Sequence, residues 1–251
     1  MVANKPTRSE RLFEELCNAH GIKWTRLAVF PNRKQPDYEL ALGSQLVVVE
    51  VKQIEPNPDD RSFSKALRAG GVASQCRDPD KVASRVRNHI KESRSQLKAY
   101  LDYLERQHRP KIPSLLILFD NADNRYTDPY TIQVAMHGFE RVQLEVPRDG
   151  SRPVVVDRGF APRNNKTIGK GKNNHLSAVV TLHEFEDLET CERRLGLRFF
   201  HNPSALCRFD PLWWQGKNVL HRVLEEKTPG QFQNWRTELC GEDGTSVRGG
   251  R

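Results

Sequence analysis

Hydrophobic and polar positions alternate most clearly in residues 37–53, where two short segments with a period of two are separated by Gly43-Ser44. Successive side chains of a β-strand point to opposite faces, so a period of two predicts strands. The glycine-containing pair between the segments predicts a turn, and therefore two neighbouring strands. The second strand has two unlike faces, because valines occupy one and the other carries Leu46, Val48, Glu50 and Lys52.

Helix signals occur at three places, as capping residues or as apolar residues with a 3.6-residue period. The predicted helices are residues 9–22, capped by Ser9; residues 79–107, opened by Asp78-Pro79; and a short helix from Asp128-Pro129 to Gly138. The segment 54–78 is rich in Pro, Ser, Gly and Arg and has no clear period. We expect this segment to be a long mobile loop.

Three more strands are predicted in the N-terminal part, at residues 23–30, 112–120 and 139–146. The resulting order is helix, three strands, helix, strand, helix, strand, which indicates an α/β protein built in layers around a mixed sheet. Beyond residue 147 the pattern is less regular, with further strands expected at 152–157, 175–185 and 197–202. We therefore expect a core at 1–147, a β-containing extension packed on it at 148–240, and a disordered tail at 241–251.

The charge of the chain is basic, with 40 Lys and Arg against 32 Asp and Glu and a net charge of +8. A basic excess favours a polyanionic partner, most commonly nucleic acid, although a soluble surface can also be basic without one. The five cysteines are scattered and contain no CxxC pair, which argues against a structural zinc site and a disulfide framework. A reducing, cytoplasmic location fits this pattern, and no apolar run is long enough for a secretory signal or a membrane partner.

Three ionisable side chains on the hairpin suggest chemistry. Glu50 and Lys52 lie two residues apart on one strand face, and Asp37 opens the preceding strand, so the hairpin brings its carboxylate near Glu50. Two converging carboxylates form the oxygen-rich pocket that Mg²⁺ or Mn²⁺ prefers. A neighbouring lysine can contact a phosphate or orient a water. The simpler alternative is an edge strand whose Glu-Lys pair faces solvent.

The spacing of these residues resembles the PD-(D/E)XK nuclease superfamily: Pro36-Asp37 is followed, after twelve residues, by Glu50-Val51-Lys52. The resemblance implies a restriction-endonuclease-like fold with an αβββαβ core, in which helices flank a mixed central sheet. It also implies that Asp37 and Glu50 bind a divalent metal, and that Lys52 assists the attacking water.

Two weaker features agree with this resemblance. Many members place a metal-binding glutamate on the first helix, where Glu10 is the best match and Glu14 lies one turn later. Gln96 and Tyr100 match the QxxxY motif of the RecB-like branch, on the helix after the ExK strand, and four-residue spacing places both on one helix face. Gln96 and Tyr100 are therefore expected to line the catalytic site. The resemblance covers residues 9–147.

The predicted function is hydrolysis of DNA phosphodiester bonds with Mg²⁺ or Mn²⁺. The alternatives are an RNA-directed nuclease, and a catalytically inactive nucleic-acid-binding or assembly protein with the same fold. Homodimers are common in this fold, and the sequence does not determine whether this protein forms one. The residues expected to contact nucleic acid are basic ones on the 79–107 helix and in the 163–174 loop, namely Arg85, Lys91, Lys166, Lys170 and Lys172. A solvated helix face and a flexible linker are the alternatives for these two segments.

Other candidate motifs favour ordinary structural roles. His175, His183 and His201 lack metal-ligand spacing, so surface or hydrogen-bonded histidines are expected. The Trp213-Trp214 pair could stack on bases, but anchoring of the C-terminal part to the core is the preferred interpretation. No GxSxG or Cys/His signature supports a serine or cysteine hydrolase.

Overall fold

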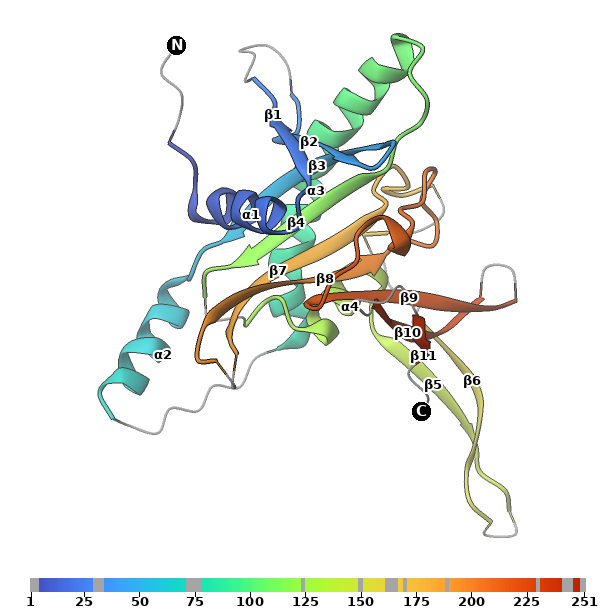
Figure 1. Cartoon of the computed structure of the whole chain (residues 1–251). Helices are drawn as coiled ribbons and strands as arrows, with labels where there is room; N and C mark the ends of the chain where they lie inside the picture. The colour runs from blue at the N-terminus through green and yellow to red at the C-terminus, as the bar shows by residue number, and fades with distance from the viewer. Residues whose placement is uncertain are drawn as a thin grey trace.

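The computed structural model describes residues 5–28, 34–70, 78–122, 125–148, 151–160, 167–168, 171–187, 190–228, 231–240 and 246–248. Within these residues, a nine-stranded mixed sheet forms the centre of the molecule (Figure 1). In spatial order its strands are β1 (Lys23–Arg26), β2 (Tyr38–Leu42), β3 (Gln45–Ile54), β4 (Ser114–Asp120), β7 (Ala178–Glu186), β8 (Arg193–His201), β9 (Val219–Thr228), β10 (Gln231–Cys240) and β11 (Ser246–Arg248). The predicted α/β class with a mixed central sheet is confirmed.

The strand directions explain why the sheet is mixed. Strands β1, β2 and β3 are antiparallel, as the hairpin pattern predicts, whereas β3, β4 and β7 run parallel. Strand β8 is antiparallel to β7 and parallel to β9, and the last three strands are antiparallel. Strand β7, from the C-terminal half of the chain, therefore directly extends the sheet begun by β1–β4.

The C-terminal strands β9, β10 and β11 are not predicted by the sequence patterns. Strand β11 lies within the tail 241–251 and pairs with β10, so the prediction of a disordered tail is wrong for residues 246–248. The rest of that tail, residues 241–245 and 249–251, lies outside the described residues.

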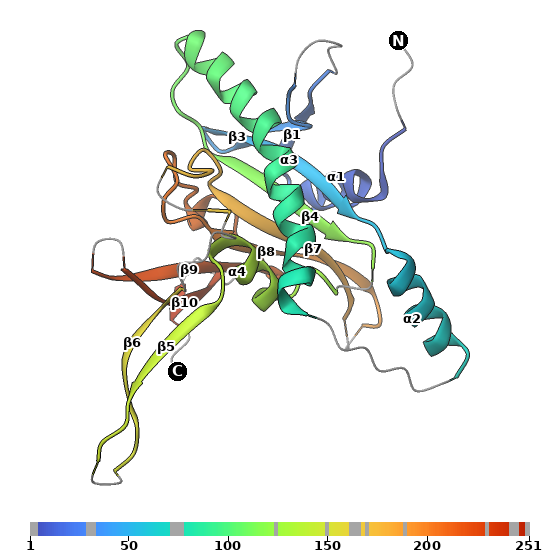
Figure 2. The ribbon, with the colours of Figure 1, turned by 180° about the vertical axis from the view of Figure 1, so that it is seen from behind.

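A separate two-stranded hairpin, β5 (Glu140–Glu145) and β6 (Val154–Phe160), projects away from the central sheet (Figures 1 and 2). Both strands are predicted from their alternating residues, but the pattern does not reveal that they pair with each other rather than with the central sheet. The boundary expected at residue 147 falls between these two strands.

Helices cover both faces of the central sheet. Helix α1 (Arg8–Ala19) lies on one face, and α3 (Pro79–Arg106) crosses the other beside α4 (Pro129–His137) (Figure 2). The apolar stripe predicted for α3 faces the sheet, since Val86, Ile90 and Leu97 are at most 1% exposed. No helix in the described ranges is long and apolar enough to span a bilayer.

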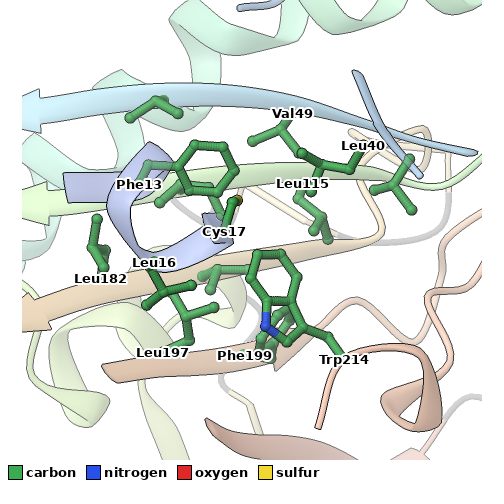
Figure 3. Packing of buried hydrophobic residues seen from close by; sticks show 14 of the residues in the cluster. Phe13, Leu16, Cys17, Leu40, Val49, Leu115, Leu182, Leu197, Phe199 and Trp214 are labelled. Carbon is green, nitrogen blue, oxygen red and sulfur yellow. The ribbon is translucent and has the colours of Figure 1, made fainter. Parts of the chain in front are cut away.

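The core between α1 and the sheet is rich in aromatic rings (Figure 3). Phe13 of α1 lies 5.2 Å from Tyr38 and 6.4 Å from Trp214, measured between ring centroids. Trp214 is only 1% exposed and also contacts Phe199 at 5.8 Å. Burial of a side chain this large contributes a few kcal/mol. The anchoring role predicted for the tryptophan pair is confirmed, because Trp213 packs against the same cluster.

The N-terminus of α1 differs from the prediction in one detail, because Thr7 and not Ser9 caps the helix. The Thr7 hydroxyl accepts a hydrogen bond from Glu10 N, and Glu10 Oε2 accepts one from Thr7 N at 2.6 Å. This reciprocal capping box satisfies two N–H groups that the first helical turn leaves without partners. Ser9 lies inside the helix and is buried.

The predicted mobile loop 54–78 is wrong in its first half, where α2 (Pro58–Arg68) forms. Asn57 caps this helix in a capping box with Asp60, and Pro58 occupies the first turn, where no N–H is needed. Asp60 is the one buried residue of α2, because its apolar residues Phe63, Ala66 and Leu67, although on one helix face, stay exposed or half-buried. The helix extends outward from the body of the molecule (Figure 1). Residues 71–77 lie outside the described residues.

Candidate active site

Strand β3 has the two-faced character that the sequence predicts. Its odd-numbered residues Val47, Val49 and Val51 pack in the core beneath α1. Its even-numbered residues face α3, where Val48 and Ile54 belong to the second core. Glu50 and Lys52 occupy this same face, between β2 and β4. The solvent-facing edge-strand alternative is therefore wrong: β3 is an interior strand and Glu50 is 0% exposed.

Asp37 lies beside these two residues because of the β2–β3 register. Its N–H donates to Val49 O at 3.1 Å, which places Asp37 at the start of β2, next to the middle of β3. Its Oδ2 accepts a hydrogen bond from Val51 N at 2.8 Å, so the carboxylate is held against the backbone between Glu50 and Lys52. The predicted convergence of Asp37, Glu50 and Lys52 is confirmed.

The Glu50 carboxylate is poorly satisfied for a buried group. Lys52 Nζ lies 2.5 Å from Glu50 Oε1, but neither Glu50 oxygen accepts a hydrogen bond of regular geometry from the described residues. Burial, and then the nearby charge of Asp37, raise the pKa of Glu50 to about 8, against the lowering effects of Lys52 and the Gln96 amide. Two carboxyl groups thus share a largely buried site with one ammonium group.

The other two groups respond to the same arrangement. Burial raises the pKa of Asp37, opposed by the Val51 N–H and by Lys52. Burial alone would lower the pKa of Lys52, but Glu50 and, more weakly, Asp37 attract its proton and raise the pKa overall. Lys52 is therefore protonated at neutral pH, and with 26% of its side chain exposed it remains accessible from solvent.

Helix α3 closes the site with polar side chains. Gln96 donates from Nε2 to Gln35 O at 3.4 Å and lies near enough to Glu50 to affect its pKa. One and two turns earlier, Glu92 and His89 interact with each other at 3.4 Å and with the charge of Lys52. The predicted position of Gln96 at the site is confirmed. His89 and Glu92 are additional site residues, and the sequence signal for them was their shared helix face with Gln96.

Tyr100 lies one turn further along α3 and contacts a different carboxylate. Its hydroxyl donates to Glu39 Oε1 at 2.8 Å, and Glu39 pairs with Val48 on β3. Tyr100 is therefore held at the rim of the site, on the side of β2. The four-residue spacing places Gln96 and Tyr100 about 6 Å apart along the helix axis, which explains why they reach different residues.

Glu10 takes part mainly in the capping box of α1. Its Oε1 also lies 3.8 Å from Arg26, and its charge raises the pKa of Asp37. Glu14 binds Arg26 at 2.6 Å and accepts from Tyr38. No group of three or more His, Cys, Asp or Glu side chains poised around a metal is found in the part of the chain that the structure describes. The role of Glu10 as a metal ligand stays a prediction.

The residues predicted to contact nucleic acid are spread over the structure. Arg85 is committed to structural contacts, since it binds Asp60 at 3.2 Å and stacks 4.3 Å from the Tyr126 ring centre. Lys91 on α3 and Lys172 are exposed. Lys166 and Lys170 lie outside the described residues. A nucleic-acid role for these side chains stays a prediction.

The histidines follow the ordinary interpretation where the structure describes their contacts. His201 Nε2 lies 2.9 Å from His221 Nδ1, and His221 Nε2 lies 2.9 Å from Trp214 O. Burial, then the neighbouring His221, lower the pKa of His201 to about 3. His201 is therefore neutral, and the two histidines form a hydrogen-bonded part of the core.

Comparison with known proteins leaves the site to be interpreted from its own geometry: no protein-family model, curated protein or solved structure matches this chain.

Proposed function

We propose that this protein is a Mg²⁺- or Mn²⁺-dependent nuclease that hydrolyses DNA, with a restriction-endonuclease-like core. The observation that carries the proposal is the buried carboxylate of Glu50, with neither oxygen regularly hydrogen-bonded, beside Asp37 and Lys52. A buried carboxylate without full compensation is costly in a purely structural role. Strongly shifted carboxylates beside a specific charge partner are typical of functional sites.

The donors present fit a hard divalent cation. Mg²⁺ keeps several of its waters and is often bound by only one or two protein carboxylates, so Asp37 and Glu50 suffice as its protein ligands. The unsatisfied oxygens of Glu50 supply the main donors, and the cation would offset the burial that raises the pKa of both carboxyl groups and the charge of Asp37 that further raises the pKa of Glu50. When bound, such a cation supplies positive charge to a phosphoryl transition state and increases the acidity of water.

Lys52 has the position and charge to orient the phosphate or the attacking water. Its ammonium is protonated, partly exposed and fixed 2.5 Å from Glu50. It can donate hydrogen bonds to a phosphate oxygen or to the attacking water, and so orient the reacting groups. Gln96 limits the orientation of the Glu50 carboxylate from the α3 side. His89 is held largely neutral, because burial lowers its pKa, and can accept or donate a proton near Lys52.

The test of this function is cleavage of plasmid DNA, single-stranded DNA and RNA by the purified protein with Mg²⁺, Mn²⁺ or a chelator. The expected result is metal-dependent cleavage of DNA. Preferential RNA cleavage would identify an RNA-directed nuclease instead. Metal-stabilised folding with no cleavage of any substrate would favour an inactive binding or assembly protein with the same site.

Replacing Gln96 by alanine is expected to lower the single-turnover cleavage rate at least about tenfold, which corresponds to about 1.4 kcal/mol of barrier. The reason is that Gln96 contacts the site from α3 while contributing little to the core. Asn88→Ala, which removes an exposed amide from the same helix, is the matched control. A Gln96→Ala protein that cleaves like the control would show that Gln96 only borders the site.

A further inference from the structure

A second polar cluster lies on the α3 face of the sheet, away from the candidate active site. Thr181 on β7 pairs directly with Arg198 on β8, so their side chains share one face. On the next strand, Arg222 pairs with Phe200, which lies two residues after Arg198 and belongs to the core beneath α3. Thr181, Arg198 and Arg222 therefore face the same side of three adjacent strands.

Each of these three side chains has a buried polar atom without a hydrogen-bond partner in the part of the chain that the structure describes. Thr181 is 1% exposed, and its Oγ1 has no hydrogen-bond partner among the described residues. The Nε atoms of Arg198 and Arg222 are also buried without one, and neither arginine forms an ion pair within the ranges that the structure describes, although the Arg222 guanidinium lies 5.9 Å from the centre of the Phe200 ring. By contrast, Arg85 and Arg87 on α3 each bind an aspartate, at 3.2 and 3.0 Å.

The charges in this cluster repel one another. Burial lowers the pKa of both arginines, and the charge of Arg198 further lowers the pKa of Arg222 and of the neighbouring His183. Asp128 is the carboxylate that favours the charged form of Arg198, but its Oδ1 already accepts hydrogen bonds from Tyr130 N and Thr131 N at the start of α4. The cluster therefore has an excess of positive charge and unused donors.

We propose that Thr181, Arg198 and Arg222 bind a phosphate group. A phosphate offers oxygens to two guanidinium forks and to a hydroxyl, and its negative charge offsets two cations that lack a carboxylate partner. This inference goes beyond the proposed nuclease function and does not depend on it. The phosphate can belong to a nucleic-acid backbone or to a small phosphorylated molecule.

The site is separate from the one around Glu50. Lys52, Leu118, Thr181 and Arg198 form one row across β3, β4, β7 and β8. With the usual strand spacing, Arg198 lies roughly 14 Å from Lys52. Thr181 belongs to the cluster, and Leu118, which lies between it and Lys52, is 0% exposed, so a buried leucine separates the two sites on this face of the sheet. A phosphate bound by the arginines is therefore not the phosphate next to Lys52.

The test is titration with inorganic phosphate, followed by calorimetry and by thermal unfolding at constant ionic strength. The wild type is expected to bind phosphate and to unfold at a higher temperature with it. Arg198→Gln and Arg222→Gln are each expected to bind at least about tenfold more weakly, and Thr181→Val less tightly than wild type. Arg193→Gln, which removes a neighbouring arginine that is ion-paired to Glu184, is the matched control and is expected to bind normally.

A second arm distinguishes the sources, using a short single-stranded oligonucleotide with a chelator present to prevent cleavage. If the oligonucleotide competes with phosphate for the wild type, and this competition is lost in both arginine variants, the ligand is a nucleic-acid backbone. Phosphate binding without competition would identify a small phosphorylated molecule. Either result supports the site. The proposal is overturned if phosphate fails to bind the wild type, or binds the glutamine variants equally well.

Folding of the variants provides an independent check. Without phosphate, Arg198→Gln and Arg222→Gln are expected to unfold at or above the wild-type temperature, because each removes one of two repelling cations. Unfolding at a much lower temperature would show that the arginines stabilise the fold by themselves, which contradicts a ligand-binding role. Arg198→Lys keeps the charge but not the planar fork, so it is expected to fold and to bind phosphate more weakly than wild type.

Discussion

Lys52→Ala protein is expected to cleave DNA roughly 10²- to 10⁴-fold more slowly than wild type, the range typical for loss of one positioned catalytic group. Lys52 is the cation closest to Glu50, at 2.5 Å, and its pKa is raised, so it is charged throughout the neutral range. The measurement is the single-turnover rate of plasmid cleavage with saturating Mg²⁺ or Mn²⁺.

A control variant and the folding of Lys52→Ala itself separate catalysis from stability. Lys98→Ala removes an exposed lysine that is paired with Asp102 on α3, and should cleave normally. Lys52→Ala itself should stay folded, because Glu50, whose pKa Lys52 lowers, can take up a proton when its partner is lost. Wild-type activity in a folded Lys52→Ala protein would rule out the proposed catalytic role.

Glu50→Gln protein is expected to lose cleavage and the stabilising effect of metal, yet to be more stable than metal-free wild type at alkaline pH. The pKa of Glu50 is raised from 4.5 to about 8. Between these values the folded protein holds the proton more tightly than the unfolded chain, so wild-type stability falls as the pH rises through this window. Over this window the wild type loses roughly 5 kcal/mol of its free energy of unfolding at most, and Glu50→Gln avoids this loss because glutamine does not ionise.

The measurement is the free energy of unfolding from pH 4 to pH 9, with and without Mn²⁺, for wild type, Glu50→Gln and the exposed control Glu186→Gln. Metal should stabilise the wild type more at higher pH, because it displaces the proton of Glu50. Asp37→Asn should likewise lose much of the metal response. An unchanged metal response in both Glu50→Gln and Asp37→Asn would show that the cation does not bind at Asp37 and Glu50.

The sequence predicts the part of the site that follows from strand geometry. Period-two alternation determines which side chains of β3 share a face, and a short hairpin determines that Asp37 lies opposite Glu50. Both follow from local chain geometry and need no knowledge of distant segments. Gln96 follows from helical periodicity in the same way.

Other features depend on information that local patterns lack. Helix α2 carries a complete start signal in Asn57, Pro58 and Asp60, but its apolar residues Phe63, Ala66 and Leu67 cover little more than one helical turn, too short a stretch to establish a period. Strand partners are also outside the reach of a local pattern, since β5 alternates as well as β2 does but pairs with β6. Tyr100 shares a helix face with Gln96, yet the carboxylate that it contacts is determined by the distance between α3 and β2.

The two-faced nature of β3 also restricts how this chain can change over evolutionary time. Deleting or inserting one residue between the Gly43 turn and Glu50 would turn Glu50 and Lys52 into the apolar core beneath α1 and bring valines to the α3 side. Such a change would remove the reactive groups and bury two charges in one event. Divergent descendants of this sequence should therefore vary in length on either side of the β2–β3 hairpin, while the interval between its turn and its charged pair stays constant.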